Sequence, residues 1–309
     1  MKFKLIYENH GNFGIHVGDY FLYLKYALES LGHRADIEYA FCPGEMNVVL
    51  ECFNDIFAEK VESNWTPGTG MIVIATEFLT GQTFNDIYQD APDSQMASDH
   101  NQRRDFWLMR HTNFIRLMPR YSAIWHVSDE QQQVYQQAFP EQIVDYLPHG
   151  YCEQFATVTH RSDSDKDIDL LFTGAMTTHR RQVLDQLEQG GLRVASTLQF
   201  TAPFHREDLI ARSKLTLNIK QHPDWQHESV TRLYYHICND SLLMTDHCRH
   251  TTDIHPHAIE RKAEWLDAVQ QQLSQGAFTE RAIATRERFA AERPVAGLIA
   301  PLLQRIGLS

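Results

Sequence analysis

Apolar and polar positions alternate along this chain in short, regular blocks. The clearest block runs from Ser213 to Asp246, where alternate apolar positions over 215–219 precede a polar loop, a helical pattern and an apolar run over 242–245. In the helical pattern, apolar residues recur at spacings of three and four and form one stripe, as on a helix that covers a sheet. This block therefore predicts strand, loop, helix and strand in succession.

The same alternation predicts strands and helices in both halves of the chain. The other expected strands are 3–7, 35–39, 48–50, 71–75, 123–127, 143–147, 168–172 and 193–195. The other expected helices are 17–31, 98–118, 128–138, 178–189, 206–212, 258–273, 279–291 and 295–306. Repeated strand–helix units of this kind predict mainly parallel sheets covered by helices.

Chain length and a polar segment near the middle indicate two domains. A chain of 309 residues is long for one domain and comfortable for two, and the charged segment 159–166 is typical of a connector. We expect one α/β domain over 1–153 and a second over 154–293. The helix at about 294–309 would pack back on the first domain.

Composition narrows the classes of function. The formal net charge of −12 argues against a nucleic-acid partner, although it leaves room for a local basic pocket that binds a small anion. No run of 18 apolar residues occurs, so we expect no membrane span, and peripheral association stays open. Five cysteines without a CxxC pair, and no signal-peptide pattern, are typical of a cytoplasmic protein. The His-rich segment 247–257 matches no ordered zinc spacing, so we expect no metal site.

The junction between the loop and the helix in 213–246 is a candidate site for a phosphorylated ligand. A helix that follows a strand presents free backbone N–H groups and the positive end of its dipole. Lys220, Glu228 and Arg232 lie near this junction in the sequence. Because Glu228 and Arg232 are four residues apart, a solvated ion pair on the helix is the plain alternative.

Five segments carry a resemblance to a known family. They are ALESLGHRADI (27–37), VDYLPHGYCEQF (144–155), DIDLLFTGAMTTHRRQVLDQL (167–187), REDLIARSKLTLNIK (206–220) and ESVTRLYYHICNDSLLMTD (228–246). In their order and spacing they resemble GT-B glycosyltransferases, in particular group-1-like and spore-coat-type members. The resemblance covers most of residues 1–250. It implies an α/β fold with two Rossmann-like, doubly wound domains that face a cleft, followed by C-terminal helices.

The resemblance implies that a nucleotide-sugar donor binds mainly to the second domain. Arg232 and Lys220 would then hold the diphosphate without a metal, and Glu228 would contact the donor sugar or the ribose. Gly174, Arg180 and Tyr235 are further donor-site candidates. Gly174 also fits an ordinary turn, and Arg180 a solvated helix start. Tyr234, Tyr235 and His236 stand where many retaining members carry the second Glu of a Glu-x7-Glu pair, which favours inversion.

The first domain would bind the acceptor and supply the base. His10, Gly11 and Gly14 follow the first expected strand, and form the acceptor-side loop. The candidates for the base are His16 and Asp19, at the start of the first helix, and Glu77, which follows the fourth strand. His16 also fits a packing role, and Asp19 fits a favourable acid in a first helical turn.

The leading hypothesis is a glycosyltransferase that moves a sugar from a nucleotide-sugar donor to a saccharide, a glycan or another hydroxyl acceptor. The nucleotide sugar is a co-substrate, and no further cofactor is expected. A non-catalytic protein that binds a nucleotide sugar or a saccharide on the same fold is the first alternative. A nucleotide-sugar epimerase is the second alternative.

Overall fold

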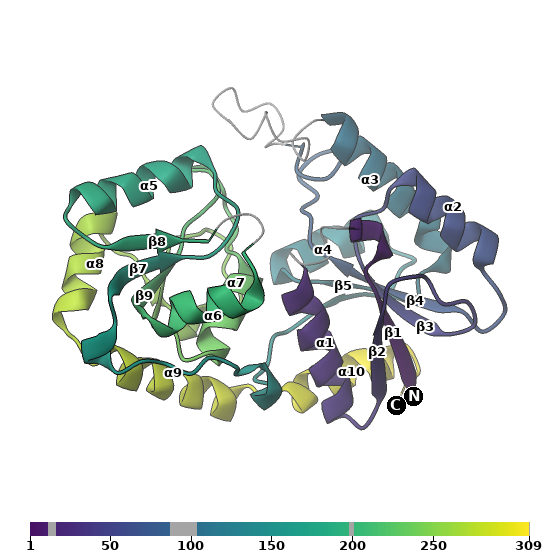
Figure 1. The fold of residues 1–309 in the computed structure, drawn as a ribbon. Coiled ribbons are helices and arrows are strands. Elements are labelled where there is room, and N and C mark those ends of the chain that lie inside the picture. The colour runs from purple at the N-terminus through teal and green to yellow at the C-terminus, as the bar shows by residue number, and fades with distance from the viewer. Residues whose placement is uncertain (12–16, 87–103, 198–200, 309) are drawn as a thin grey trace. The chain divides into compact units, whose positions relative to one another are not determined.

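The computed structural model describes residues 1–11, 17–86, 104–197 and 201–308. The chain forms two compact units, and each has its own sheet and helices (Figure 1). Unit 1 comprises Met1–Pro148 together with Val295–Ser309, and unit 2 comprises His149–Pro294. The chain therefore leaves unit 1 after Pro148 and returns to it at Val295.

Unit 1 is built on a parallel sheet that has six strands within the described residues. Their order is β2 (Arg34–Glu38), β1 (Lys2–Ile6), β3 (Met46–Leu50), β4 (Gly70–Ala75), β5 (Ala123–His126) and β6 (Val144–Tyr146). The order reverses direction between β1 and β3, so the carboxyl ends of these two strands form a switch point where ligands commonly bind.

Helices cover the sheet of unit 1. They are α1 (Gly18–Ser30), α2 (Asp55–Asn64), α3 (Arg104–Leu117), α4 (Asp129–Ala138) and α10 (Val295–Arg305), with a short 3-10 helix over Met118–Arg120. One face of the sheet packs on α2, α3 and α4 through a core that includes Phe57, Phe114 and Tyr135. As predicted, Ser128 caps α4, because its hydroxyl accepts the N–H of Gln131.

Unit 2 contains a parallel sheet with five described strands. Their order is β11 (Ile259–Glu260), β10 (Leu243–Thr245), β9 (Ser213–Asn218), β7 (Ile168–Phe172) and β8 (Val194–Ser196). The chain passes from β7 outward to β8 and then crosses back to β9 on the other side of β7. The switch point of this sheet therefore lies at the carboxyl ends of β7 and β9.

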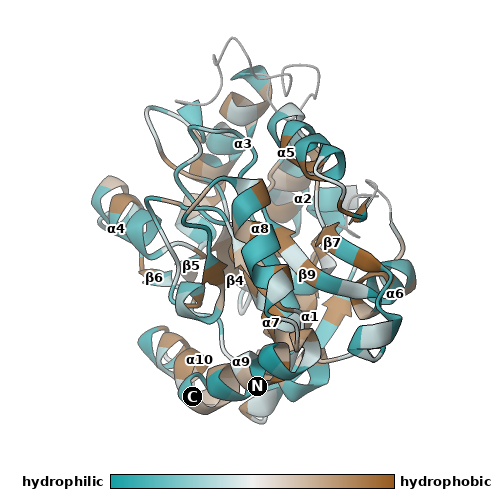
Figure 2. Ribbon diagram, turned by 90° about the vertical axis from the view of Figure 1, so that its left-hand side faces the viewer, coloured by the Kyte–Doolittle hydropathy of each residue, from teal (hydrophilic) through white to brown (hydrophobic). Residues whose placement is uncertain are grey.

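The helices of unit 2 are α5 (Thr178–Gln189), α6 (Pro203–Ala211), α7 (Val230–Cys238), α8 (Trp265–Ser274) and α9 (Phe278–Glu292), with 3-10 helices over Glu153–Phe155, Asp163–Asp165 and His255–His257. Apolar side chains of β7, β9 and β10 pack with α5, α8 and the start of α9. In Figure 2, strands β7 and β5 are coloured as hydrophobic, whereas most of helix α8 is coloured as hydrophilic.

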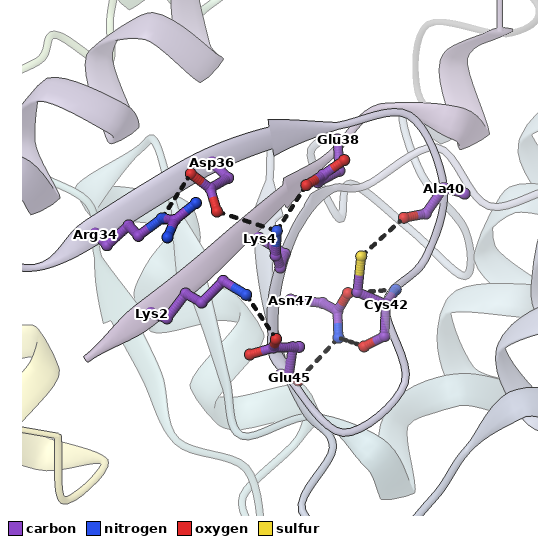
Figure 3. A network of polar contacts seen from close by, with 9 residues as sticks. All are labelled: Lys2, Lys4, Arg34, Asp36, Glu38, Ala40, Cys42, Glu45 and Asn47. Carbon is purple, nitrogen blue, oxygen red and sulfur yellow. Dashed lines mark hydrogen bonds and ion pairs between the residues drawn. The ribbon is translucent and has the colours of Figure 1, made fainter.

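Ion pairs tie the edge strand β2 to the rest of unit 1. The ammonium of Lys4 lies 3.1 Å from Asp36 and 2.6 Å from Glu38, and Lys2 lies 2.9 Å from Glu45. Figure 3 shows Lys4 between its two carboxylates. Because β1 and β2 pair in parallel with Lys4 opposite Asp36, these charges balance one another on the polar face of the sheet.

The prediction of parallel sheets covered by helices is confirmed, and one expected helix is wrong in its extent. The helix expected over 258–273 begins at Trp265, and the residues before it include β11, whose Ile259 pairs with Met244. A strand of two residues leaves no periodic pattern in the sequence. Helix α2 was not predicted at all.

Candidate functional site

The switch point of unit 2 is held together by the start of α5. Thr177 caps this helix, because its hydroxyl accepts the N–H of Arg180 and donates to the carbonyl of Gln221, 2.8 Å away. The cap thereby joins the segment after β7 to the segment after β9. Side chains from α5 and α7 converge on the ends of these two strands.

Arg232 reaches from α7 to the ends of both strands. Its Nε donates to the carbonyl of Thr173, and its Nη1 donates to Oδ1 of Asn218 at 2.5 Å. The guanidinium carbon lies 4.9 Å from the ring centre of Phe172, which is the distance of a cation–π contact. Its Nη2 makes no hydrogen bond to any described residue, so one donor remains for a ligand.

Arg180 approaches the same ring from α5. Its Nε donates to the carbonyl of Ile219 at 3.0 Å, and its Nη1 donates to the carbonyl of Ala175 at 2.7 Å. Its guanidinium carbon lies 5.1 Å from the ring centre of Phe172. Within the described parts of the chain, Nη2 of Arg180 also has no hydrogen-bond partner.

The two guanidinium groups have no balancing charge, although Arg180 is buried and Arg232 is half-buried. Their partners are carbonyl oxygens and an amide, and none of the described carboxylates forms an ion pair with either. Burial lowers the pKa of Arg232 to about 10, and burial together with the charge of Arg232 lowers the pKa of Arg180. Because an unpaired buried cation is costly, this arrangement favours the binding of an anion.

Gly174 provides room for Arg232. Its φ angle is +145°, and a Cβ atom there would lie 2.3 Å from Nη2 of Arg232. The N–H of Gly174 donates to the hydroxyl of Thr197 at 3.0 Å, so it is already occupied. The sequence offered phosphate contact or an ordinary turn as the reason for this glycine, and the structure adds the close approach of a guanidinium.

Lys220 lies at the end of β9, beside a buried carboxylate. Its backbone N–H donates to Asp246 at 3.4 Å, and its ammonium donates to the carbonyl of Pro223 at 2.8 Å. Asp246 is also paired with Arg261 at 2.7 Å. Lys220 therefore adds a third cation close to the ends of β7 and β9, and a neutral carbonyl holds its ammonium.

Tyr235 and Glu228 flank Arg232 in the sequence, but their side chains have other contacts. Tyr235 is buried, and the guanidinium carbon of Arg206 lies 3.8 Å from its ring centre. The Glu228 side chain is fully buried and accepts hydrogen bonds from the N–H and hydroxyl of Thr252 and from Nδ1 of His255, at 2.7 Å. Glu228 therefore anchors the segment around 252–255, and it does not pair with Arg232.

The first-domain candidates are only partly within the described residues. Gly14 and His16 lie outside them. Asp19 lies in the first turn of α1, where a carboxylate suits the helix dipole. Gly11 adopts a φ angle of +52° with open space around its Cα, so a turn conformation is sufficient reason for glycine.

Glu77 follows β4 and His10 follows β1, so both lie at the carboxyl edge of the sheet of unit 1. The Glu77 carboxylate accepts hydrogen bonds from Arg110 at 3.0 Å and from the Asn85 amide at 2.7 Å. The His10 ring is buried nearby, and its Nε2 makes no hydrogen bond within the described chain. Burial and the charge of Arg110 lower the pKa of His10 to about 4, so this ring is neutral at physiological pH.

Comparison with known proteins identifies the fold. No protein-family model matches the sequence, and no curated protein matches it. Among solved structures, T4 phage BGT in complex with its UDP-glucose substrate aligns over 100% of both chains with a TM-score of 0.52 and 11% identity. The DNA modifying enzyme beta-glucosyltransferase aligns over 100% of both chains with a TM-score of 0.54 and 12% identity. The chain has the GT-B fold.

A third GT-B structure, TarM, aligns with 85% of this chain and 54% of its own, with a TM-score of 0.51 and 6% identity. At such identities the comparisons establish the GT-B architecture, and the chemistry must be argued from the residues themselves. In addition, no helix in the described parts of the chain is both long enough and apolar enough to cross a membrane.

Several polar residues of the GT-B switch points were not singled out from the sequence. In unit 2 they are Thr173, Asn218 and Arg206, and in unit 1 they are Glu51, Asn85 and Arg110. One signal was present for Arg110, because it shares a helical face with Phe114 and Leu117, which are both buried. A lone charged residue on an apolar stripe indicates a buried partner.

The described residues contain no group of three or more His, Cys, Asp or Glu side chains that could hold a metal ion. The His-rich segment 247–257 contributes to separate pairs: His247 lies 2.6 Å from Glu260, and His255 lies 2.7 Å from Glu228. These histidines therefore serve local ion pairing in unit 2.

Proposed function

We propose that this protein is a glycosyltransferase that moves a sugar from a nucleoside diphosphate sugar to a hydroxyl acceptor. One observation carries the proposal: Arg180, which is buried, and Arg232, which is half-buried, lie at the switch point of unit 2 with only neutral partners. A diphosphate supplies the missing negative charge, and the Nη2 atoms are free to donate to its oxygens. The GT-B fold and the UDP-glucose complex of T4 phage BGT support UDP as the nucleotide.

The chemical step then needs charge stabilisation at one end and proton removal at the other. The acceptor oxygen forms a bond to the anomeric carbon of the sugar while the bond from that carbon to the phosphate oxygen breaks. The electron pair leaves on UDP, where Arg180, Arg232 and Lys220 stabilise the developing charge. We infer that these cations take the place of a metal ion.

We propose Glu77 as the base that accepts the proton of the acceptor hydroxyl. Its carboxylate is oriented by two side chains and remains partly exposed, at 19% of its side-chain surface. A base on the face opposite the leaving phosphate produces inversion. Glu228 cannot act as a free carboxylate near the sugar, because its oxygens are occupied by Thr252 and His255.

The acceptor in this proposal is a saccharide, a glycan or another hydroxyl compound. One similar structure is described as a DNA modifying enzyme. The formal net charge of −12 on this chain argues against the same class of acceptor, because nucleic-acid binding depends on clustered cations.

The first experiment is calorimetric titration with UDP, UMP and uridine, followed by incubation with UDP-sugars and a panel of acceptors. If two cations hold the diphosphate, UDP binds more tightly than UMP, and uridine binds weakly. Product analysis by mass spectrometry would then show the glycosylated acceptor and free UDP, at the same rate with and without EDTA. Equal affinity for UDP and uridine would contradict the assignment of the arginines.

The same experiment separates the two alternatives. UDP-sugar binding with no turnover on any acceptor would support a non-catalytic binding protein. The hydrogen bonds of Glu228 to Thr252 and His255 also favour this alternative, because they occupy its carboxylate. Conversion of the UDP-sugar to a different UDP-sugar without an acceptor would identify an epimerase. Transfer that is lost with EDTA and restored by magnesium would refute the metal-independent mechanism.

A further inference from the structure

Unit 1 contains a buried row of charges that the donor chemistry does not use. Arg110 of α3 binds Glu51 with two nitrogens, Nε at 3.1 Å and Nη2 at 2.8 Å, and Nη2 also donates to the Glu51 carbonyl at 2.9 Å. The same Nη2 donates to Glu77 at 3.0 Å. One guanidinium is therefore shared between two carboxylates that follow the neighbouring strands β3 and β4.

Exposure differs along this row. The side chain of Glu51 is 0% exposed and that of Arg110 is 7% exposed, whereas that of Glu77 is 19% exposed. Only Glu77 thus presents a carboxylate to a molecule outside the core. The guanidinium carbon of Arg110 also lies 4.7 Å from the ring centre of Trp107, which limits its movement.

Glu77 is fixed at its backbone as well as at its side chain. Its carbonyl oxygen accepts the hydroxyl of Tyr135 at 2.8 Å and lies 3.1 Å from Nε2 of His126. The amide of Asn85 holds the second carboxylate oxygen, and Asn85 itself is locked to Phe78 through its backbone N–H at 2.7 Å. The carboxylate therefore has one defined orientation.

The histidines, the cysteine and the tyrosines around this row are neutral near pH 7. Burial lowers the pKa of His126 to about 4, and burial with the charge of Arg110 lowers that of His10 to about 4. Burial raises the pKa of Cys52, Tyr121 and Tyr135, which leaves these groups protonated. Burial also raises the pKa of Glu51, against the opposing charge of Arg110. Arg110 is thus the one cation beside Glu77 within the described residues.

We propose that Arg110 is a positioning residue for glycosyl transfer, which holds the Glu77 carboxylate aimed at the acceptor hydroxyl, while Glu51 holds Arg110 in place. This inference rests on the proposed function, in which Glu77 takes the acceptor proton. A planar guanidinium can hold Glu51 with two nitrogens in a fixed geometry while it also reaches Glu77, and a lysine ammonium lacks this planar, two-pronged geometry.

The test compares Arg110→Gln, Arg110→Lys and the control Arg116→Gln. Arg116 lies on the same helix, but it is exposed and pairs with Glu62 at 2.5 Å. Arg110→Gln leaves the Glu51 carboxylate buried without a partner, so this variant can fail to fold. The double variant Glu51→Gln/Arg110→Gln removes that buried charge, and it provides a folded protein without Arg110 for the comparison.

The readouts are kcat, KM for the acceptor and the dissociation constant of UDP, measured through UDP release from UDP-glucose with the acceptor that supports it. In Arg110→Gln and in the double variant, we expect kcat to fall by about 100-fold while KM and UDP affinity stay unchanged, because the carboxylate loses its orientation and the donor site of unit 2 is untouched. Arg110→Lys should recover part of this loss, to about tenfold below the unsubstituted protein, because an ammonium restores a contact without the planar geometry. Arg116→Gln should match the unsubstituted protein.

A folded double variant that retains the kcat of the unsubstituted protein would overturn this inference. An equal loss of kcat in Arg110→Gln and Arg110→Lys, or a loss of UDP affinity along with kcat, would likewise reduce Arg110 to a structural residue. Failure of the proposed function looks different: the unsubstituted protein would then release no UDP.

Discussion

Replacement of Arg232 by Gln should separate ligand binding from stability. Burial lowers the pKa of this guanidinium from its usual value to about 10, which corresponds to a cost to the folded state of about 3 kcal/mol near neutral pH. Below pH 10 both the folded and the unfolded state carry the charge, and the cost is complete. The cost fades as the pH rises above 10, because the folded state loses its charge first. Arg232→Gln removes this cost.

The substitution also removes hydrogen bonds to Thr173 and Asn218. At about 1–1.5 kcal/mol each, their loss offsets most of the gain. We therefore expect the unfolding free energy of the ligand-free protein to stay the same or to rise by up to about 1 kcal/mol. This expectation is unusual, because most substitutions of a buried residue destabilise a protein.

Binding of UDP should change in the opposite direction. Loss of the charge-assisted contacts to the diphosphate should cost about 2–4 kcal/mol, or roughly 30- to 1,000-fold in affinity. UDP at 100 times the dissociation constant of the unsubstituted protein stabilises that protein by about 2.7 kcal/mol. At the same UDP concentration, the variant should gain less than about 1 kcal/mol.

The assay is urea unfolding with and without UDP, supported by calorimetric titration. Arg193→Gln is the matched control, because Arg193 lies in the same unit, pairs with Asp169 at 3.1 Å and is 57% exposed. The control should bind UDP normally and leave the urea midpoint close to that of the unsubstituted protein, because an exposed ion pair contributes little to stability. A ligand-free Arg232→Gln protein that is destabilised by more than about 2 kcal/mol, with UDP stabilisation intact, would refute the reasoning.

Three further predictions test other parts of the structure. Gly174→Ala should weaken UDP binding at least about tenfold and destabilise the protein by about 1–3 kcal/mol, because the added methyl group meets the Arg232 guanidinium and the φ angle is positive. The control Gly297→Ala, at a helix position with open space, should leave UDP binding unchanged and be neutral or stabilising in the same titration and unfolding assays. The hydrogen bond to Glu228 raises the pKa of His255. The stability that this pair contributes is complete below about pH 6.5 and is lost as the pH rises through the raised pKa of the folded state. The difference in urea stability between the unsubstituted protein and Glu228→Gln should therefore shrink from about pH 6 to about pH 8.5, and a constant difference would contradict the pairing. Lys4→Met should lower the unfolding free energy by about 1–2 kcal/mol without changing UDP affinity, since its two carboxylate partners belong to unit 1.

Local pattern was sufficient where an element's own residues determine it. The strand over 168–172 and the helix over 178–189 have the bounds expected from the sequence. Thr177 caps this helix, and its apolar residues Val183, Leu184 and Leu187 face the core. These features act within a few residues of one another, so the sequence alone displays them.

Tertiary pairing was the part that local pattern could not supply. Strand β11 exists because Ile259 pairs with Met244, and no periodic signal marks it. Glu228 and Arg232 have the spacing of a helix ion pair, yet Glu228 precedes α7 and binds Thr252, while Arg232 turns to Thr173. The partner of each charge is 24 or 59 residues away along the chain. The sequence spacing predicted that Glu228 and Arg232 lie in the same region of the fold. Which residues they bind depends on the tertiary structure, which the spacing does not show.

The two switch points differ in charge in a way that matches the two ends of a glycosyl transfer. The switch point of unit 2 has buried cations with neutral partners, which suits a group that departs with negative charge. The switch point of unit 1 has one cation shared between two carboxylates, and the exposed member is Glu77, which suits a group that gives up a proton. If both arrangements served stability alone, neutral residues of similar shape would do as well, because buried charges rarely stabilise a fold. Both arrangements lie at the carboxyl ends of parallel strands, where α/β sheets commonly bind ligands, so a ligand explains each charge pattern better than stability does.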